Sequence, residues 1–278
     1  GQSWGLVFFK KSTRTRLSFE AGIYELGGNP MVLQADDLQI SRGETVEDTA
    51  KIFGRFLHGI VIRTFGQDMV DSFAKYSGLP VINALTDLLH PCQSYTDMFT
   101  MIEHFGKGSE NPECIRGKKF AFFGDTACNM AYSLALAGSM FGVEVVLCGP
   151  EEFRPKAELD ALFDAANLKK SYTFTSDPRE AAKGADVFYT DVWVSMGKED
   201  EKAERIKTMS PYQVNEKLVE LGAKDSIFMH CLPAHAGEEV SEGVLRSDKS
   251  IVFDQAENRL HVQKAIVSWL VGKNRQSR

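Results

Sequence analysis

A cluster of hydroxyl and guanidinium side chains near the start of the chain has the chemistry of an anion-binding site. It occupies residues 12–16 (STRTR) and directly follows an apolar run at 5–9. Apolar residues then recur at helical spacing, so the cluster falls where a strand turns into a helix. The first N–H groups of a helix lack internal partners, and together with Arg14 they suit a phosphate or a carboxylate. The simpler alternative is a Ser/Thr N-cap followed by surface arginines.

Two further groups of polar residues follow strands of the same predicted sheet. Arg63 ends one apolar run, and His90 and Gln93 follow the next. Because ligands of parallel sheets bind outside the carboxyl ends of the strands, we expect all three beside the anion cluster. Together they can polarise a carbonyl oxygen and bind an adjacent amide nitrogen. Taken alone, His90 is equally well interpreted as a structural histidine.

The second half of the chain contains a turn that superficially resembles a nucleotide-binding loop. The strand at 119–125 leads through Thr126, Ala127 and Cys128 to Asn129. The glycines of a G-x-G-x-x-G fingerprint are missing, so a dinucleotide site is not expected. Asn129 is either a helix N-cap or a donor to a substrate carboxylate.

Two later loops carry polar groups suited to an amine. Asp191 and Ser195 lie on one loop, which Gly197 would allow to close over an ammonium ligand. The charged run that follows, 198–205, is expected to be a solvated face. Cys231 ends another strand and, taken alone, is typical of a small buried apolar residue. No helix N-terminus or evident base flanks it, so a covalent nucleophile is not indicated.

The elements that must position these residues alternate between strands and helices along the whole chain. We therefore predict an α/β fold of two domains, each a mainly parallel sheet flanked by helices. The expected strands are 5–9, 30–34, 59–65, 80–85, 119–125, 144–149, 172–176, 186–193, 226–231 and 250–254. A polar Gly- and Pro-containing segment at 105–114 is typical of a linker and separates predicted domains at 1–107 and 115–258. The last apolar-periodic stretch, 262–270, can dock on either domain. It lies within a predicted C-terminal helix, 259–278, that can pack back on the first domain.

Composition restricts the classes of function. The 278 residues are 43% hydrophobic and 25% charged without a long apolar stretch, which argues against disorder and a membrane span. A net charge of −6 disfavours nucleic acid as a partner. The five cysteines are scattered and lack a CxxC pair, which disfavours a disulfide scaffold or zinc site and favours a reducing, cytoplasmic location.

Taken together, four motifs resemble the aspartate/ornithine carbamoyltransferase family, and most closely its members that act on ornithine. They are STRTR at 12–16, HPCQ at 90–93, DVWVSMG at 191–197 and HCLP at 230–233. Their order and spacing agree with the family over essentially the whole chain, although the family's usual N-terminal helical segment is lacking. Lys11 also stands where many relatives carry proline.

The resemblance implies transfer of the carbamoyl group of carbamoyl phosphate to the δ-amine of L-ornithine, giving L-citrulline and phosphate. The residues that it assigns to carbamoyl phosphate are Ser12, Thr13, Arg14, Thr15, Gln39, Arg63, His90, Gln93, Leu232 and Arg259. Those that it assigns to ornithine are Asn129, Asp191, Ser195, Met196 and Cys231, with Arg63, His90, Asp191 and Cys231 as the catalytic set. It further implies no metal or organic cofactor, and a homotrimer in which the loop of Gln39 completes a neighbour's site.

Several alternatives stay open at this point. Putrescine is the second candidate substrate, because one or two changes can alter such a pocket. Aspartate-specific members typically have HPLP in place of the HCLP at 230–233. A truncated carbamoyl phosphate-binding protein without turnover is also compatible with the motifs, whereas a nicotinamide-dependent oxidoreductase is disfavoured by the missing glycine fingerprint. The sequence does not distinguish arginine biosynthesis from citrulline catabolism.

Overall fold

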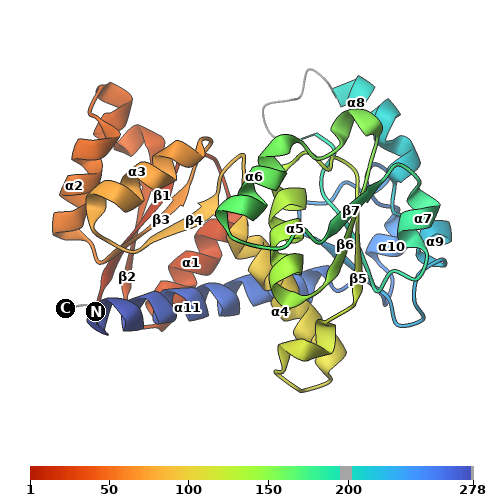
Figure 1. Ribbon diagram of the computed structural model, residues 1–278. Coiled ribbons are helices and arrows are strands. Elements are labelled where there is room, and N and C mark those ends of the chain that lie inside the picture. The colour runs from red at the N-terminus through yellow and green to blue at the C-terminus, as the bar shows by residue number, and fades with distance from the viewer. Residues whose placement is uncertain (195–201, 277–278) are drawn as a thin grey trace. The chain divides into compact units, whose positions relative to one another are not determined.

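The protein is described here by a computed structural model covering residues 1–194 and 202–276. Its contacts divide the chain into two compact units. Unit 1 comprises Gly1–Gln93 and Glu257–Arg278, and unit 2 comprises Ser94–Ala256. Each unit contains one sheet whose strand pairs are all parallel, with helices packed on both faces, which confirms the predicted fold class (Figure 1).

Unit 1 is built on a four-stranded sheet in the order β2-β1-β3-β4. Side chains of β1 alternate between its faces, as the strand pleat requires. Leu6 and Phe8 pack with Phe19 and Val267 on one face, whereas Val7 packs with Phe73 on the other. The elements are β1 (Ser3–Phe8), α1 (Thr13–Glu25), β2 (Asn29–Gln34), α2 (Val46–Phe56), β3 (Gly59–Arg63), α3 (Gln67–Ser77), β4 (Val81–Leu85) and the later part of α11 (Val252–Gln276).

Unit 2 is built on a five-stranded sheet in the order β7-β6-β5-β8-β9. The central strand is buried on both faces, which explains its nearly continuous apolar sequence, KFAFF. The elements are α4 (Pro91–Gly106), β5 (Lys119–Phe123), α5 (Asn129–Phe141), β6 (Glu144–Cys148), α6 (Ala157–Ala165), β7 (Tyr172–Thr175), α7 (Pro178–Ala182), β8 (Val187–Thr190), α8 (Lys202–Met209), α9 (Glu216–Val219), β9 (Ile227–His230), α10 (Glu242–Leu245) and the start of α11. Short 3-10 helices are η1 (Ala35–Asp37), η2 (Gln39–Arg42), η3 (Pro112–Ile115), η4 (Glu151–Phe153) and η6 (Ser210–Tyr212).

Both sheets reverse their winding direction at one strand pair. In unit 1 the chain passes from β1 to β2 on one side and continues through β3 and β4 on the other, so the reversal lies between β1 and β3. In unit 2 it lies between β5 and β8. In open α/β sheets, ligands bind outside the carboxyl ends of the strands at such points. The topology therefore marks the loops after β1, β3, β5 and β8.

The predicted strand at 250–254 is wrong, because α11 begins at Val252 and only Ser250 forms an isolated bridge, to Phe228. Short apolar runs such as Ile251 to Phe253 fit a strand or a buried helix equally well. The contact boundaries also fall elsewhere than the polar segment 105–114: they lie between Gln93 and Ser94 and between Ala256 and Glu257. Both boundaries are near or within helices, where composition gives no signal. Among the described residues, no helix is long and apolar enough to cross a membrane.

The pairing of Trp4 with Gly59 across β1 and β3 leaves no room for a side chain at position 59. A Cβ there would lie 2.4 Å from the ring of Trp4, which is 1% exposed. We expect Gly59→Ala to lower the free energy of unfolding by about 1–3 kcal/mol, as overpacking does. Urea denaturation measures the change.

Gly272 provides the matched control for this substitution. It is exposed within α11, and nothing lies within 4 Å of a Cβ built there. Gly272→Ala should raise the free energy of unfolding by up to ~1 kcal/mol, because alanine favours a helix interior. Equal effects of the two substitutions would contradict the steric explanation.

Candidate active site

The predicted anion cluster follows β1 at the reversal point of the first sheet. Ser12 is the N-cap of α1, and its hydroxyl accepts a hydrogen bond from the backbone N–H of Thr15 at 3.2 Å. Ser12 therefore does cap the helix, as the simpler interpretation of a Ser/Thr N-cap expected. This places the cluster at the positive end of the helix dipole. Arg14 is half-buried and Thr13 is exposed. The turn thus presents hydroxyl, guanidinium and backbone N–H donors together.

Arg259 joins residues from three distant parts of unit 1. Its guanidinium, in a residue only 3% exposed, donates to Thr15 Oγ1 at 3.1 Å and to Gln93 Oε1 at 2.6 Å. The side-chain amide of Gln263 is oriented with its oxygen toward Arg259 and its nitrogen toward Ser18. In this orientation the oxygen accepts from Arg259 Nε and Nη2 at 3.0 and 2.8 Å, and the nitrogen donates to Ser18 Oγ at 2.6 Å. The arginine therefore fixes the hydroxyl of Thr15 and the side-chain amide of Gln93 in one network.

His90 lies immediately before α4 and is 5% exposed. Burial lowers its pKa well below the ordinary 6.5, and the positive charges of Arg259 and Arg63 lower it further. The imidazole is therefore neutral at neutral pH, and a neutral imidazole can donate one hydrogen bond to a substrate oxygen. Arg63 is the last residue of β3. Of the predicted carbamoyl phosphate residues, Gln39 is exposed at the start of η2 (Gln39–Arg42), a position open to another molecule.

Asp191 and Cys231 come together at the ends of two adjacent strands. Thr190 of β8 pairs with His230 of β9, so the next residue on each strand faces the same edge. The thiol of Cys231 donates to Asp191 Oδ1 at 3.0 Å. Burial and the carboxylate of Asp191 raise the pKa of this thiol well above 9.0. It therefore stays protonated and acts as a hydrogen-bond donor, in agreement with the expectation that it is not a covalent nucleophile.

The turn after Cys231 is held by bonds on both sides. Leu232 has a φ of 56°, in the left-handed region, and its peptide bond to Pro233 is cis. A non-glycine residue in this region costs about 1–3 kcal/mol unless its surroundings determine it. Leu232 N–H donates to His230 Nδ1, and His230 N–H donates to Gln255 Oε1, both at 2.8 Å. Gln255 in turn donates to the buried Asp97 at 2.7 Å.

Asn129 is the first residue of α5, and Cys128 is the N-cap. The N-cap interpretation of Asn129 is therefore wrong, because the helix starts one residue earlier than that role requires. Its side chain lies at the helix N-terminus beyond β5, where a donor to a carboxylate would be placed. Ser195 and Met196, predicted on the loop after β8, lie outside the described residues.

Arg205 contradicts the expectation that the charged run 198–205 is a solvated face. It is 7% exposed, donates to Asp125 Oδ2 at 2.5 Å and to the Trp193 carbonyl at 2.8 Å, and stacks on the ring of Phe153. The carboxylate that follows β5 supplies the partner that allows this burial. Charge patterning alone does not show which member of a charged run turns inward.

Sequence reasoning missed two buried glutamines, Gln255 and Gln263, that orient the predicted site residues. With Arg259 they form a stripe of polar residues spaced by four along α11, and all three are at most 3% exposed. Polar residues that recur at helical spacing on a buried face are a readable signal. The spacing was missed because the predicted helix starts only at 259, after Gln255.

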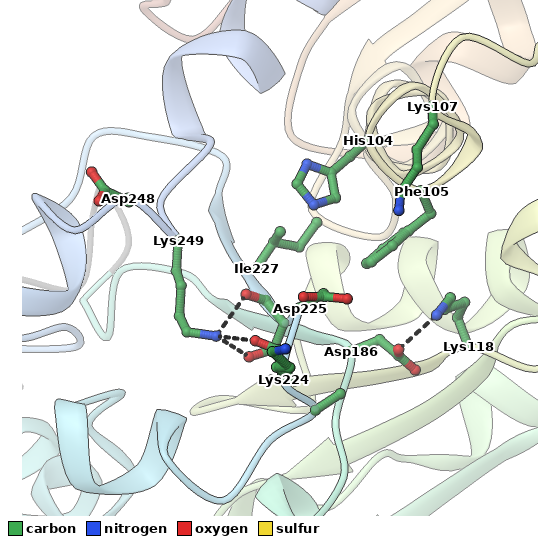
Figure 2. Close-up of a pocket in the computed structure, with 12 residues that line it drawn as sticks. His104, Phe105, Lys107, Lys118, Asp186, Lys224, Asp225, Ile227, Asp248 and Lys249 are labelled. Carbon is green, nitrogen blue, oxygen red and sulfur yellow. Dashed lines mark hydrogen bonds and ion pairs between the residues drawn. The ribbon is translucent and has the colours of Figure 1, made fainter.

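A separate pocket of about 730 Å³ lies at the opposite edge of the second sheet. Figure 2 shows His104 and Lys107 from the end of α4 above Lys118, Asp186 and Asp225, which precede strands β5, β8 and β9. Lys118 and Asp186 form an ion pair across it at 2.8 Å. Since ligands of such sheets bind at the carboxyl ends, this amino-end pocket is not part of the predicted site.

The low pKa of His90 makes stability depend on pH. Below pH 6.5 the unfolded chain protonates this histidine while the folded chain does not. The free energy of unfolding should therefore fall as the pH drops through this range, by on the order of 1 kcal/mol between pH 7.5 and 5.5 for this residue. We expect His90→Asn to lose that share of the pH dependence in urea titrations. If the free energy of unfolding changed by the same amount between pH 7.5 and 5.5 in His90→Asn and in the unmodified chain, a neutral buried His90 would be contradicted.

Comparisons with known proteins cover nearly the whole chain. Sequence models of the aspartate/ornithine carbamoyltransferase family match it twice, the carbamoyl-P binding domain over residues 1–103 and the Asp/Orn binding domain over 116–270. A curated ornithine carbamoyltransferase from Thermococcus kodakarensis is 47% identical over 274 residues, 98% of this chain and 84% of the relative. The ornithine carbamoyltransferase of Bifidobacterium longum subsp. infantis is 47% identical over 276 residues, 99% of this chain and 85% of the relative.

Solved structures show the same likeness. Ornithine carbamoyltransferase from Pyrococcus furiosus superposes with a TM-score of 0.87 at 45% identity, over 96% of this chain and 84% of that one. The anabolic ornithine carbamoyltransferase from Campylobacter jejuni gives a TM-score of 0.87 at 38% identity, over 98% and 88%. The turn motifs, the two parallel sheets and these matches lead to one conclusion: the chain belongs to the aspartate/ornithine carbamoyltransferase family.

Proposed function

We propose that this chain transfers the carbamoyl group of carbamoyl phosphate to the δ-amine of L-ornithine, forming L-citrulline and phosphate. The single observation that carries the choice of an amine acceptor is the contact between Cys231 and Asp191, 3.0 Å apart at the ends of β8 and β9. A carboxylate and a neutral thiol suit an amine, and the relatives named above are ornithine carbamoyltransferases. Because these relatives are ornithine rather than putrescine carbamoyltransferases, ornithine is the preferred candidate acceptor.

The proposed carbamoyl phosphate site is the network of unit 1. Ser12, Thr13, Arg14 and Thr15 would bind the phosphate at the start of α1, where donors and the helix dipole favour an anion. Gln93 would bind the carbamoyl amide, and its bond to Arg259 at 2.6 Å fixes its orientation. Gln93 Oε1 accepts that bond with one lone pair and keeps a second lone pair to accept from an N–H of the carbamoyl amide.

The carbonyl oxygen of carbamoyl phosphate would lie against Arg63 and neutral His90. The lone pair of the attacking nitrogen forms the new C–N bond, and negative charge develops on that oxygen. Donors already in place stabilise this charge without reorganising. The C–O bond to phosphate then breaks while a proton passes from the attacking nitrogen to the phosphate, and Arg14 stabilises the departing hydrogen phosphate dianion. No covalent enzyme intermediate is required.

The proposed ornithine site is the strand-end cluster of unit 2. Asn129, Asp191, Ser195 and Met196 would hold the α-amino and carboxylate groups, and Cys231 and the Leu232 backbone would lie beside the δ-amine. Only a neutral amine has the lone pair needed for attack, so activity rises as the δ-ammonium loses its proton. Holding both substrates in reacting geometry supplies much of the rate.

We further propose a homotrimer in which Gln39, exposed at the start of η2, contributes to a neighbour's site. All five cysteines lie in the described part of the chain and are free thiols. This supports the proposal of a reducing, cytoplasmic location. Metal ions and organic cofactors have no part in the proposed transfer.

The acceptor specificity is tested by offering ornithine, putrescine and aspartate separately with carbamoyl phosphate. We expect carbamoylation of ornithine alone, measured as citrulline and as released phosphate. Turnover with putrescine alone would overturn the ornithine assignment. Saturable carbamoyl phosphate binding without turnover of any acceptor would instead identify a binding protein.

Arg14 and Arg16 provide a matched pair for the phosphate site. Arg14 is half-buried at the start of α1, whereas Arg16 is exposed and pairs with Glu20 at 3.3 Å. Loss of a charge-assisted hydrogen bond in Arg14→Ala should weaken carbamoyl phosphate binding by roughly 10- to 100-fold, whereas Arg16→Ala should leave it unchanged. Calorimetric titration measures both. Equal affinities of the two variants would remove the basis for the phosphate site.

A further inference from the structure

Three potential metal ligands gather in the loop that follows β9. Atoms of His235, Glu238 and Glu239 that can each bind an ion lie within 4.8 Å of one another. Gly237, with a φ of 91°, lets the backbone reverse, and Glu238 N–H donates to the His235 carbonyl at 2.9 Å. The reversal brings side chains from both ends of this turn to one place.

One carboxylate oxygen in this group is buried without a partner. Glu239 is 0% exposed, and its Oε1 accepts from His235 N–H at 2.5 Å and lies 3.3 Å from His230 Nε2. Its Oε2 has no hydrogen-bond partner within the described ranges, 1–194 and 202–276. Burial of such an oxygen is costly, and an unsatisfied group of this kind needs an explanation.

The orphan oxygen faces His235 at a separation suited to a shared ion. Glu239 Oε2 lies 3.8 Å from His235 Nδ1. Two ligands of a tetrahedral transition metal, each bonded at about 2.0–2.2 Å, are separated by roughly 3.4 Å, so a shift of a few tenths of an ångström suffices. The His235 side chain is 50% exposed, which gives an ion access from solvent.

We propose that His235, Glu238 and Glu239 form a binding site for a divalent transition-metal cation. One imidazole with two carboxylates suits zinc, cobalt or nickel, whereas calcium and magnesium prefer all-oxygen sites. The ion supplies the partner that Glu239 Oε2 lacks. Because Glu239 also contacts His230, whose Nδ1 holds Leu232, the site is linked to the turn beside Cys231.

A second group of possible ligands is the alternative location for such an ion. Asp191, His230 and Cys231 also lie within 4.8 Å of one another. All three already have hydrogen-bond partners, since Cys231 donates to Asp191 and His230 Nδ1 accepts from Leu232. Cobalt distinguishes the two locations, because only an ion bound at Asp191, His230 and Cys231 would form a cobalt–thiolate bond, which absorbs intensely in the near ultraviolet.

The test is titration of the full chain with cobalt chloride, followed by calorimetry and absorption spectroscopy. We expect one ion per chain without thiolate absorption, unchanged binding in Cys231→Ser, and binding at least about tenfold weaker in His235→Ala and Glu238→Gln. His261→Ala is the matched control, since His261 is also half exposed and lies 3.5 Å from a glutamate. It should bind cobalt as the unmodified chain does.

Three results would overturn the proposal. They are no cobalt binding by the unmodified chain, binding that survives His235→Ala, and binding that Cys231→Ser abolishes. Thermal melting of each variant without cobalt shows whether it is folded. If His235→Ala does not fold, cobalt binding by Glu238→Gln still decides the test. The carbamoyl-transfer assay is not used, so failure of this site and failure of the proposed function are distinguishable.

Discussion

The buried guanidinium of Arg259 is the interaction on which the predicted phosphate half-site depends. A cation that is 3% exposed must be compensated by acceptors, and Thr15, Gln93 and Gln263 supply them. Burial lowers the pKa of His90, and the same charge lowers it further and so favours the neutral form. One group thus orients a hydroxyl, orients an amide and helps to keep an imidazole neutral. With Arg14 and Arg63 it makes this part of unit 1 suited to a dianion.

Much of this arrangement was predictable because it follows from local patterns. The turn after β1, the helix that Ser12 caps and the parallel sheets all follow from hydrophobic periodicity and strand-end logic. The links to Arg259 were not predictable, since they join residues 166 and 244 positions apart. The false strand at 250–254 concealed them further, because it hid the start of α11 and with it the spacing of Gln255 from Arg259.

The two half-sites solve different physical problems. Unit 1 gathers positive charge and donors at a helix N-terminus, where flexible hydroxyls and guanidinium groups can follow a phosphate. Unit 2 instead determines backbone direction, since the left-handed Leu232 is fixed by His230 and Gln255. Hydrophobic patterns show where a strand ends but not how the next residue turns. This is why Asp191 and Cys231 were predicted as residues while their mutual bond and the support behind it were not.

Four of the five cysteines of this protein are poor nucleophiles. Burial raises the pKa of Cys92 to about 11 and that of Cys148 to about 12, and it raises those of Cys128 and Cys231 well above 9.0. Alkylating agents and peroxide react with the thiolate, which these four residues hardly populate at neutral pH. In the proposed transfer, a thiolate at Cys231 would compete with the amine for the carbamoyl group. Keeping that sulfur protonated would protect the enzyme from carbamoylating itself.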